Sequence, residues 1–175
     1  MSGKKVKSQR IVIDACVAHS ASADGERPQG ANCRRFLIAF RAVGHRLLMN
    51  AAMREEWKRH YSAFSLRWLA SMESIGKVVT TDAVVKEEIV EAILELCVTD
   101  EVRTKFRNDI HLLHLSCTSD LRIASSDDKA KLHLWNSSAA FLKIRDLIWV
   151  NPATEDDLPE WLAAGAPAKG RYLRP

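Results

Sequence analysis

Short apolar runs alternate along the chain with longer stretches in which apolar residues recur at helical spacing. The runs are rich in Val, Ile and Leu, and they predict strands at 10–14, 45–49, 121–125 and 146–150. Segment 77–82 is predicted as a short strand or an extended link. Near-continuous apolar runs of this length are typical of strands that are buried on both faces of a parallel sheet.

Helical periodicity fills most of the sequence between these runs. The predicted helices cover 36–43, 51–69, 85–96, 109–117 and 126–142. Asp82 and Thr99 are predicted N-caps, Gly44 a helix C-terminus, and segment 20–32 a loop. Because strands alternate with helices, we expect an α/β fold of three layers, α/β/α, with a central, mainly parallel sheet.

The 175 residues suit a single domain with a sizeable core. Residues 1–9 form a basic N-terminal extension without the apolar region of a signal peptide. The domain is predicted to cover 10–155. Prolines, alanines and basic residues then predict a C-terminal tail at 156–175, with one helical turn near its start.

Composition narrows the class of protein. Apolar residues make up 47% of the chain and charged residues 27%, as in soluble globular proteins, and no apolar run is long enough to span a membrane. The four cysteines form no CxxC pair, which indicates a reduced, cytoplasmic protein. A net charge of +4 fits an RNA partner, but many enzymes without a nucleic-acid role have a similar charge.

Carboxylates lie beside predicted core segments at four separate places, namely Asp14, Glu56, Asp109 and Asp127. Burying an unpaired carboxylate costs several kcal/mol or shifts its pKa, and shared binding of a cation removes that cost. Asp14 ends a predicted strand and Asp127 lies just past another, and ligands of parallel sheets bind beyond the carboxyl ends of the strands. Since Mg²⁺ and Mn²⁺ prefer oxygen ligands, the pattern predicts a site for one of these metals.

The segments around these acids resemble the motifs of PIN-domain nucleases. They read IVIDACV, AMREEW, DIHLLHLS and IASSD, in this order. The family has an Asp closing the first strand, a Glu in the helix after the second strand, an Asp opening a helix D-x-x-L-L-x-L-A, and an Asp after a late strand. DLIWVNPATE resembles its last strand and turn, so the resemblance covers about residues 10–155. Cys16 departs from it, because many relatives have Ser or Thr there.

The resemblance implies a PIN-like fold and an endoribonuclease that hydrolyses RNA phosphodiester bonds with Mg²⁺ or Mn²⁺. One metal at Asp14 and Asp127 would generate hydroxide from bound water, and a second near Glu56 and Asp109 would stabilise the leaving oxygen. The resemblance also suggests that the chain is the toxin of a toxin–antitoxin pair. Its partners would then be an antitoxin protein and a second copy of the chain. The alternative is a PIN-like module that binds RNA or a protein without cleaving.

Two of the acidic positions leave a choice between neighbours. Glu55 could replace Glu56 as a ligand, and Glu56 is preferred because it directly precedes the apolar Trp57. Asp127 is preferred over Asp128, which is either a further metal ligand or an N-cap. Either of the two serines before them, Ser125 and Ser126, could hydrogen-bond a carboxylate in support of the metal.

Cationic and aromatic residues interleave after Glu56. Lys58 and Arg59 are predicted to contact RNA phosphates. The aromatic stripe with Trp57 and Trp68 is interpreted as core beneath arginines that extend to the surface, and stacking on RNA is the alternative.

Two other classes of site fit the sequence less well. A structural zinc site at His111, His114 and Cys117 would need a fourth ligand that no second pair supplies. A haloacid-dehalogenase phosphotransferase needs a second Asp two residues after the first, where this chain has Cys16.

Overall fold

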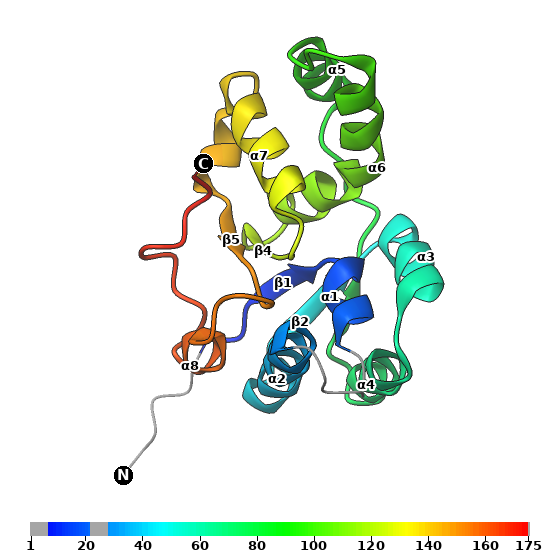
Figure 1. Ribbon diagram of the computed structural model, residues 1–175, viewed down its shortest axis with the longest axis vertical. Coiled ribbons are helices and arrows are strands. Elements are labelled where there is room, and N and C mark those ends of the chain that lie inside the picture. Colours follow the sequence, from blue (N-terminus) through cyan, green and yellow to red (C-terminus); the bar gives the residue numbers. More distant parts are fainter. Residues whose placement is uncertain (1–6, 22–27, 175) are drawn as a thin grey trace.

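The computed structural model describes residues 7–21 and 28–174, and within them it has a central sheet of five parallel strands (Figure 1). The strands are β1 (Arg10–Ile13), β2 (Arg46–Met49), β3 (Val78–Thr80), β4 (Arg122–Ala124) and β5 (Ile148–Val150), in the order β3-β2-β1-β4-β5. Helices cover the sheet on both sides. The predicted α/β class, with three layers and a mainly parallel sheet, is therefore confirmed.

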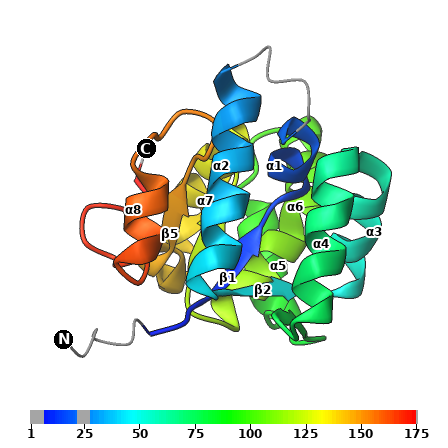
Figure 2. The ribbon, with the colours of Figure 1, turned by 90° about the horizontal axis from the view of Figure 1, so that it is seen from below.

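Eight α-helices lie in the described residues. They are α1 (Ala15–Ser20), α2 (Pro28–Val43), α3 (Ala51–His60), α4 (Ala63–Ser74), α5 (Glu87–Glu95), α6 (Asp100–Cys117), α7 (Asp128–Asn136) and α8 (Leu158–Ala163), with 3-10 turns at Ser137–Ala139 and Leu142–Asp146. Figure 1 shows α5, α6 and α7 on one side of the sheet and α2, α4 and α8 on the other. Figure 2 shows α8 lying beside α2.

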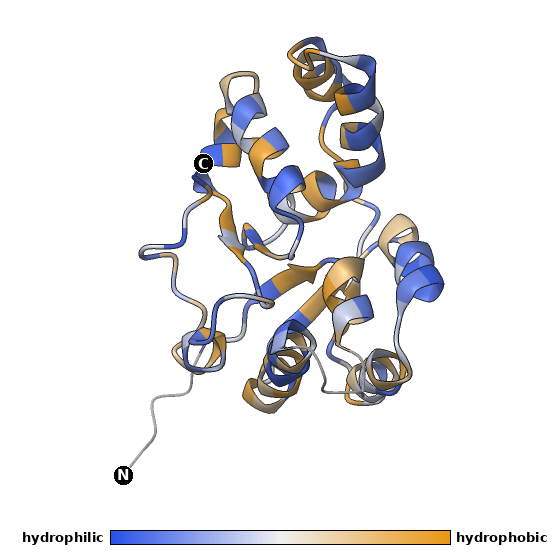
Figure 3. Cartoon of the chain, viewed as in Figure 1, coloured by the Kyte–Doolittle hydropathy of each residue, from blue (hydrophilic) through white to orange (hydrophobic). Residues whose placement is uncertain are grey.

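The core is centred on β1, which pairs with β2 on one side and β4 on the other. Its residues Ile11, Val12 and Ile13 are fully buried. The strands are hydrophobic along most of their length in Figure 3, whereas α3 and α6 carry long hydrophilic stretches. Burial of β1 on both faces explains its continuous apolar run.

The aromatic stripe belongs to this core. Trp57 and Trp68 are buried and stack with ring centroids 6.0 Å apart. Trp57 Nε1 donates to the Ile13 carbonyl (2.9 Å), and Trp68 Nε1 donates to the Leu37 carbonyl (2.7 Å). Both indoles thus satisfy their only donor inside the protein. The interpretation of these two tryptophans as core is confirmed.

Two of the predicted helix ends are confirmed, and one is wrong. Gly44 follows α2 with φ +83°, a conformation that glycine adopts without strain. The Thr99 hydroxyl accepts a hydrogen bond from the Val102 N–H (3.2 Å) at the start of α6. Asp82 caps no helix, because α5 begins only at Glu87.

The predicted helix over 51–69 is in fact two helices, α3 and α4. The chain turns at Ser62, whose hydroxyl accepts from the Ser65 N–H (3.1 Å) while the Ser65 hydroxyl accepts from the Ser62 N–H (2.8 Å). This reciprocal capping box satisfies the first amides of α4 and stabilises a new helix start. The apolar periodicity continues across the break, which is why the sequence pattern conceals it.

Two other boundaries differ from expectation. Asp109 does not open a helix: it lies inside α6, which the Thr99 cap starts nine residues earlier. The predicted loop 20–32 ends earlier, because α2 begins at Pro28, and proline suits the first turn of a helix. Residues 22–27 of that loop lie outside the described residues.

The segment predicted as a tail is packed against the body of the protein through residue 174. Leu158, Leu162 and Leu173 are buried, and the Leu173 N–H donates to the Leu147 carbonyl (2.6 Å). Apolar residues at this spacing hold α8 against α2, which explains why the segment does not extend into solvent.

Four residues fasten this segment, and we call them the C-terminal clasp: Glu155, Asp157, Trp161 and Arg171. The Arg171 guanidinium pairs with both carboxylates, at 2.5 Å from Asp157, and lies over the Trp161 ring at 5.6 Å from its centroid.

Within the part of the chain that the structure describes, no helix combines the length and the apolar character needed to cross a membrane.

Candidate active site

Asp14 follows β1 directly and lies at the carboxyl edge of the sheet. Its N–H donates to the Ala124 carbonyl at the end of β4 (2.9 Å), so the neighbouring strands end together. The side chain is buried, and its Oδ2 accepts hydrogen bonds from Ser125 Oγ (2.6 Å) and from Cys16 Sγ (3.2 Å). Two donors therefore fix the orientation of this carboxylate.

Ser125 connects Asp14 with the start of α7. Its fully buried hydroxyl donates to Asp14 and accepts from the Asp127 N–H (3.0 Å). Asp127 is the N-cap of α7, because its Oδ1 accepts from the N–H groups of Lys129 and Ala130, both at 2.9 Å. Its other oxygen accepts no hydrogen bond from the described residues, which leaves that oxygen available to a ligand.

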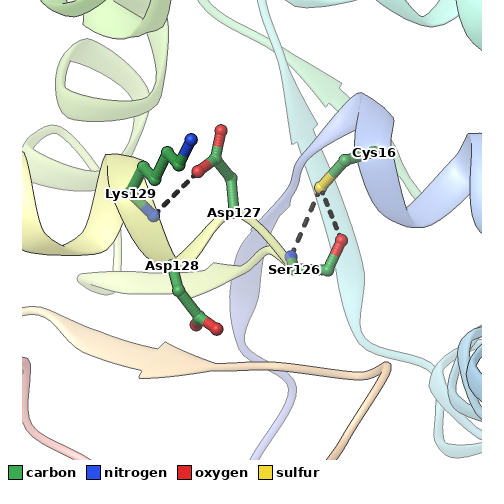
Figure 4. Close-up of a pocket in the computed structure, with 5 residues that line it drawn as sticks. All are labelled: Cys16, Ser126, Asp127, Asp128 and Lys129. Carbon is green, nitrogen blue, oxygen red and sulfur yellow. Dashed lines mark hydrogen bonds between the residues drawn. The ribbon is translucent and has the colours of Figure 1, made fainter.

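Cys16 and Ser126 lie beside this pair (Figure 4). Ser126 donates to Cys16 Sγ from its hydroxyl (3.1 Å) and from its N–H (3.3 Å). Burial, followed by the charge of Asp14, raises the pKa of the Cys16 thiol to about 12, so the thiol keeps its proton and can donate to Asp14. Of the two predicted supporting serines, Ser125 contacts a carboxylate and Ser126 contacts the thiol.

Asp128 points away from Asp127 (Figure 4). It is exposed, and its Oδ1 accepts from Asn151 Nδ2 (3.3 Å) just beyond the end of β5. Asp127 and Asp128 nevertheless line the same open hollow of about 420 Å³, together with Cys16, Ser126 and Lys129. The structure therefore brings Asp127, rather than Asp128, toward the other predicted acids.

Glu56 projects from α3 toward α6, where its Oε2 lies 2.8 Å from His111 Nε2. The two groups stand at ion-pair distance, but their atoms are not aligned for a hydrogen bond. Glu55 projects to solvent instead and pairs with Lys58 (2.6 Å). Glu56 is thus the glutamate that acts on another predicted acid, Asp109, whereas Glu55 engages Lys58.

The charges of Glu56 and His111 affect each other's protonation. Contact with His111 lowers the pKa of Glu56, although burial opposes this shift. Burial is the largest single influence on His111 and lowers its pKa, but contact with Glu56 and the charge of Asp14 outweigh it, so the pKa of His111 is raised. Its Nδ1 donates to the Asn108 carbonyl (2.9 Å), which fixes the ring. A contact between the buried His111 and the partly buried Glu56 therefore joins α3 to α6.

Asp109 has the most perturbed carboxyl group of the site. Burial, followed by the charges of Asp127, Asp14 and Glu56, raises its pKa to about 6, while His111 opposes them. The other three predicted acids, which lie on different elements, thus act electrostatically on Asp109. Perturbed carboxyl groups of this kind are concentrated at functional sites.

The three residues considered for zinc have separate environments. His111 faces Glu56, whereas His114 Nδ1 accepts from the Val85 N–H (3.0 Å). Cys117 is a buried thiol whose pKa burial raises to about 11. Nothing in this arrangement directs the three side chains toward a common ion.

A divalent metal fits the acidic residues by the chemistry of their donors. As the side chains stand, no three His, Cys, Asp or Glu residues among those described are placed to hold a metal ion between them. The candidate donors are nevertheless carboxylate oxygens, which suit Mg²⁺ and Mn²⁺. Burial is the largest cause of the raised pKa of Asp109, and the charges of Asp127, Asp14 and Glu56 add to it; a bound cation would offset both.

Sequence reasoning missed two contacts of the site. It did not pair His111 with Glu56, and it did not assign Cys16 as a hydrogen-bond donor to Asp14. A signal for His111 was present in the sequence, since a histidine follows Asp109 by two residues in a segment rich in leucine.

Comparison with known proteins adds no relative to this picture: no protein-family model, no curated protein and no solved structure matches the chain.

Proposed function

We propose that this chain is a metal-dependent endoribonuclease that hydrolyses RNA phosphodiester bonds. The observation that carries the proposal is the pKa of Asp109, raised to about 6 by burial and by the charges of Asp127, Asp14 and Glu56. Four carboxylates from separate elements that share one electrostatic field are costly unless a cation joins them. The resemblance of the surrounding motifs to PIN-domain nucleases points to the same chemistry.

Each residue of the site has a distinct part in this proposal. Asp14, Asp109, Asp127 and Glu56 would hold Mg²⁺ or Mn²⁺, which when bound lowers the pKa of a water and stabilises charge on the phosphate. Ser125 is a positioning residue, because it holds Asp14 by a hydrogen bond of 2.6 Å. His111 positions Glu56 in the same sense. No side chain of this set needs to act as a nucleophile.

The test is cleavage of generic single-stranded RNA in the presence of Mg²⁺ or Mn²⁺. We expect Asp14→Asn to cut RNA at least about 100-fold more slowly than the wild type, since loss of one group that stabilises the reacting charge typically costs 10²–10³-fold. Asp146→Asn is the matched control, because Asp146 is exposed and precedes β5 at the opposite edge of the sheet. Equal rates for wild type and Asp14→Asn would refute the proposed site.

One observation favours a second candidate function. Among the described residues, no three His, Cys, Asp or Glu side chains are placed to hold a metal ion together. A PIN-like module that binds RNA or a protein without cleaving does not need such a set. RNA that binds to the wild type but stays intact at every metal concentration would identify such a module.

Partners and location belong to the same proposal. We propose from the resemblance that the chain is a toxin with a small antitoxin protein and forms a homodimer. The four cysteines are all free, which suits the reducing cytoplasm that we propose as its location. Growth arrest on expression, relieved by a small DNA-binding protein encoded next to it, is the expected result.

A further inference from the structure

A second hollow lies between α3 and α6, next to the acids. Its volume is about 410 Å³, and its lining residues are Ala52, Glu55, Glu56, Arg59, His60, Asn108 and His111. Glu56 and His111 belong both to this hollow and to the candidate active site, so a group bound in the hollow would be adjacent to that site. The volume is within the range of small-ligand pockets, which begins at about 300 Å³.

The two carboxylates of the hollow have partners, whereas its arginine has none within the described part of the chain. Glu55 is paired with Lys58 at 2.6 Å, and Glu56 is paired with His111 at 2.8 Å. Among the described residues, the Arg59 guanidinium has no ion pair and no hydrogen bond to a carboxylate, although its charge contributes to lowering the pKa of both Glu55 and Glu56. Arg59 is therefore the surplus cation of this hollow.

The two walls of the hollow offer different chemistry. On the α3 wall, Arg59 presents a planar fork of N–H donors that matches phosphate oxygens. On the α6 wall, Asn108 is exposed, and its side-chain amide can both donate and accept, as the edge of a nucleobase requires. A nucleotide carries both a phosphate and a base, so a single nucleotide could contact Arg59 and Asn108 together in this hollow.

We propose that the hollow between α3 and α6 binds one nucleotide of a single-stranded RNA beside the bond that is cut. Arg59 contacts its phosphate, and Asn108 contacts its base. The choice of RNA as ligand rests on the proposed endoribonuclease function. A single strand is required because a base that is paired in a duplex cannot turn its edge into a hollow between two helices.

Binding of a short fluorescent single-stranded RNA, without divalent metal, tests this assignment apart from cleavage. We expect Arg59→Ala to raise Kd about 10-fold and to reduce the salt dependence of binding by about one phosphate contact. Asn108→Ala should raise Kd about 5-fold without changing the salt dependence. Arg41→Ala is the matched control, because Arg41 is also an exposed arginine in the last turn of its helix, at the other edge of the sheet. It should change Kd less than about 2-fold.

The possible outcomes separate this inference from the proposed function. If Arg59→Ala and Asn108→Ala fold and bind as the wild type does, or if the wild type binds no RNA, the inference is overturned. An equal loss of affinity in Arg41→Ala would also overturn the inference, since the RNA would then be attracted to positive charge anywhere on the surface. If RNA binds through Arg59 but is never cut, the hollow is supported and the endoribonuclease proposal fails.

Discussion

Two aspartates of this protein respond to their surroundings in opposite ways. In the C-terminal clasp, contact with Arg171 lowers the pKa of Asp157. At the carboxyl edge of the sheet, burial and neighbouring carboxylates raise the pKa of Asp109 to about 6. In the clasp, two carboxylates share one cation, Arg171, at contact distance. At the candidate site, the charges of Asp127, Asp14 and Glu56 all act on Asp109, and only His111 opposes them.

The charged groups of the clasp stabilise the folded state, whereas the carboxylates of the candidate site destabilise it. In the clasp, Arg171 fastens the segment that carries α8 and Leu173 to the body. In the candidate site, the excess of negative charge opposes folding, and such a cost is typical of sites kept for binding or catalysis.

The largest effect is expected from breaking the clasp. Arg171→Ala removes two ion pairs and the contact with Trp161 from a side chain that is 16% exposed. We expect the free energy of unfolding to fall by roughly 2–3 kcal/mol, because the loss includes a partly buried ion pair and a cation–π contact. Urea unfolding monitored by tryptophan fluorescence measures this change.

Arg107→Ala is the control for that experiment. Arg107 pairs with Glu91 at 3.6 Å, and both side chains are more than half exposed, at 58% and 52%. Surface pairs of this kind contribute less than about 1 kcal/mol. Similar destabilisation by both substitutions would show that the clasp is an ordinary surface network.

A smaller effect of opposite sign is expected at the candidate site. Asp109→Asn removes a carboxylate whose pKa rises from 3.8 to about 6 on folding. A shift of about two units corresponds to at most about 3 kcal/mol, and solvent at the partly exposed group reduces this to about 1–2 kcal/mol. The metal-free variant should therefore be more stable than the wild type at pH 7.5 by that amount.

The pH dependence of this gain has a definite direction. The folded wild type binds more protons than the unfolded chain between pH 3.8 and about 6, so its stability falls as pH rises through that window. The advantage of Asp109→Asn should accordingly vanish near pH 4 and be complete above about pH 6. A constant difference across the range would contradict the electrostatic origin of the shift.

The smallest effect concerns His45, a buried residue that links the segment before β1 to α8. Its Nδ1 accepts from the Gln9 N–H (3.0 Å), and its Nε2 donates to the Leu162 carbonyl (3.0 Å), so the ring is neutral. Burial lowers its pKa below 6.5, and the charges of Arg122 and Lys77 contribute, although the bond to Leu162 opposes them. The stability it provides is complete above pH 6.5 and declines as pH falls below that value.

Imidazole nitrogen chemical shifts, followed by NMR from pH 7.5 downward, measure the state of His45 directly. The neutral Nε2–H form should persist below pH 6.5, the ordinary pKa of histidine. A ring that is already half protonated at pH 6.5 would contradict the burial of His45 and its contact with α8.

Local sequence patterns predicted the strands and helices well where burial places apolar residues at regular spacing. The apolar run before Asp14 predicted β1, and the aromatic stripe with Trp57 and Trp68 predicted that both side chains belong to the core. The break at Ser62 escaped prediction because a capping box interrupts the backbone without interrupting the apolar stripe. Asp109 was misplaced at a helix start because nothing in its immediate sequence marks where α6 begins.

The sequence by itself determined the α/β class, the strands, the buried tryptophans and the carboxylates beside core segments, since burial imposes a local pattern that residue types reveal. Only the tertiary structure decided that β1 and β4 are neighbours, that Ser125 bonds Asp14, and that His111 faces Glu56. These contacts join residues more than 50 positions apart. Hydrogen bonds and charge interactions depend on distances in the folded chain, which no local pattern encodes.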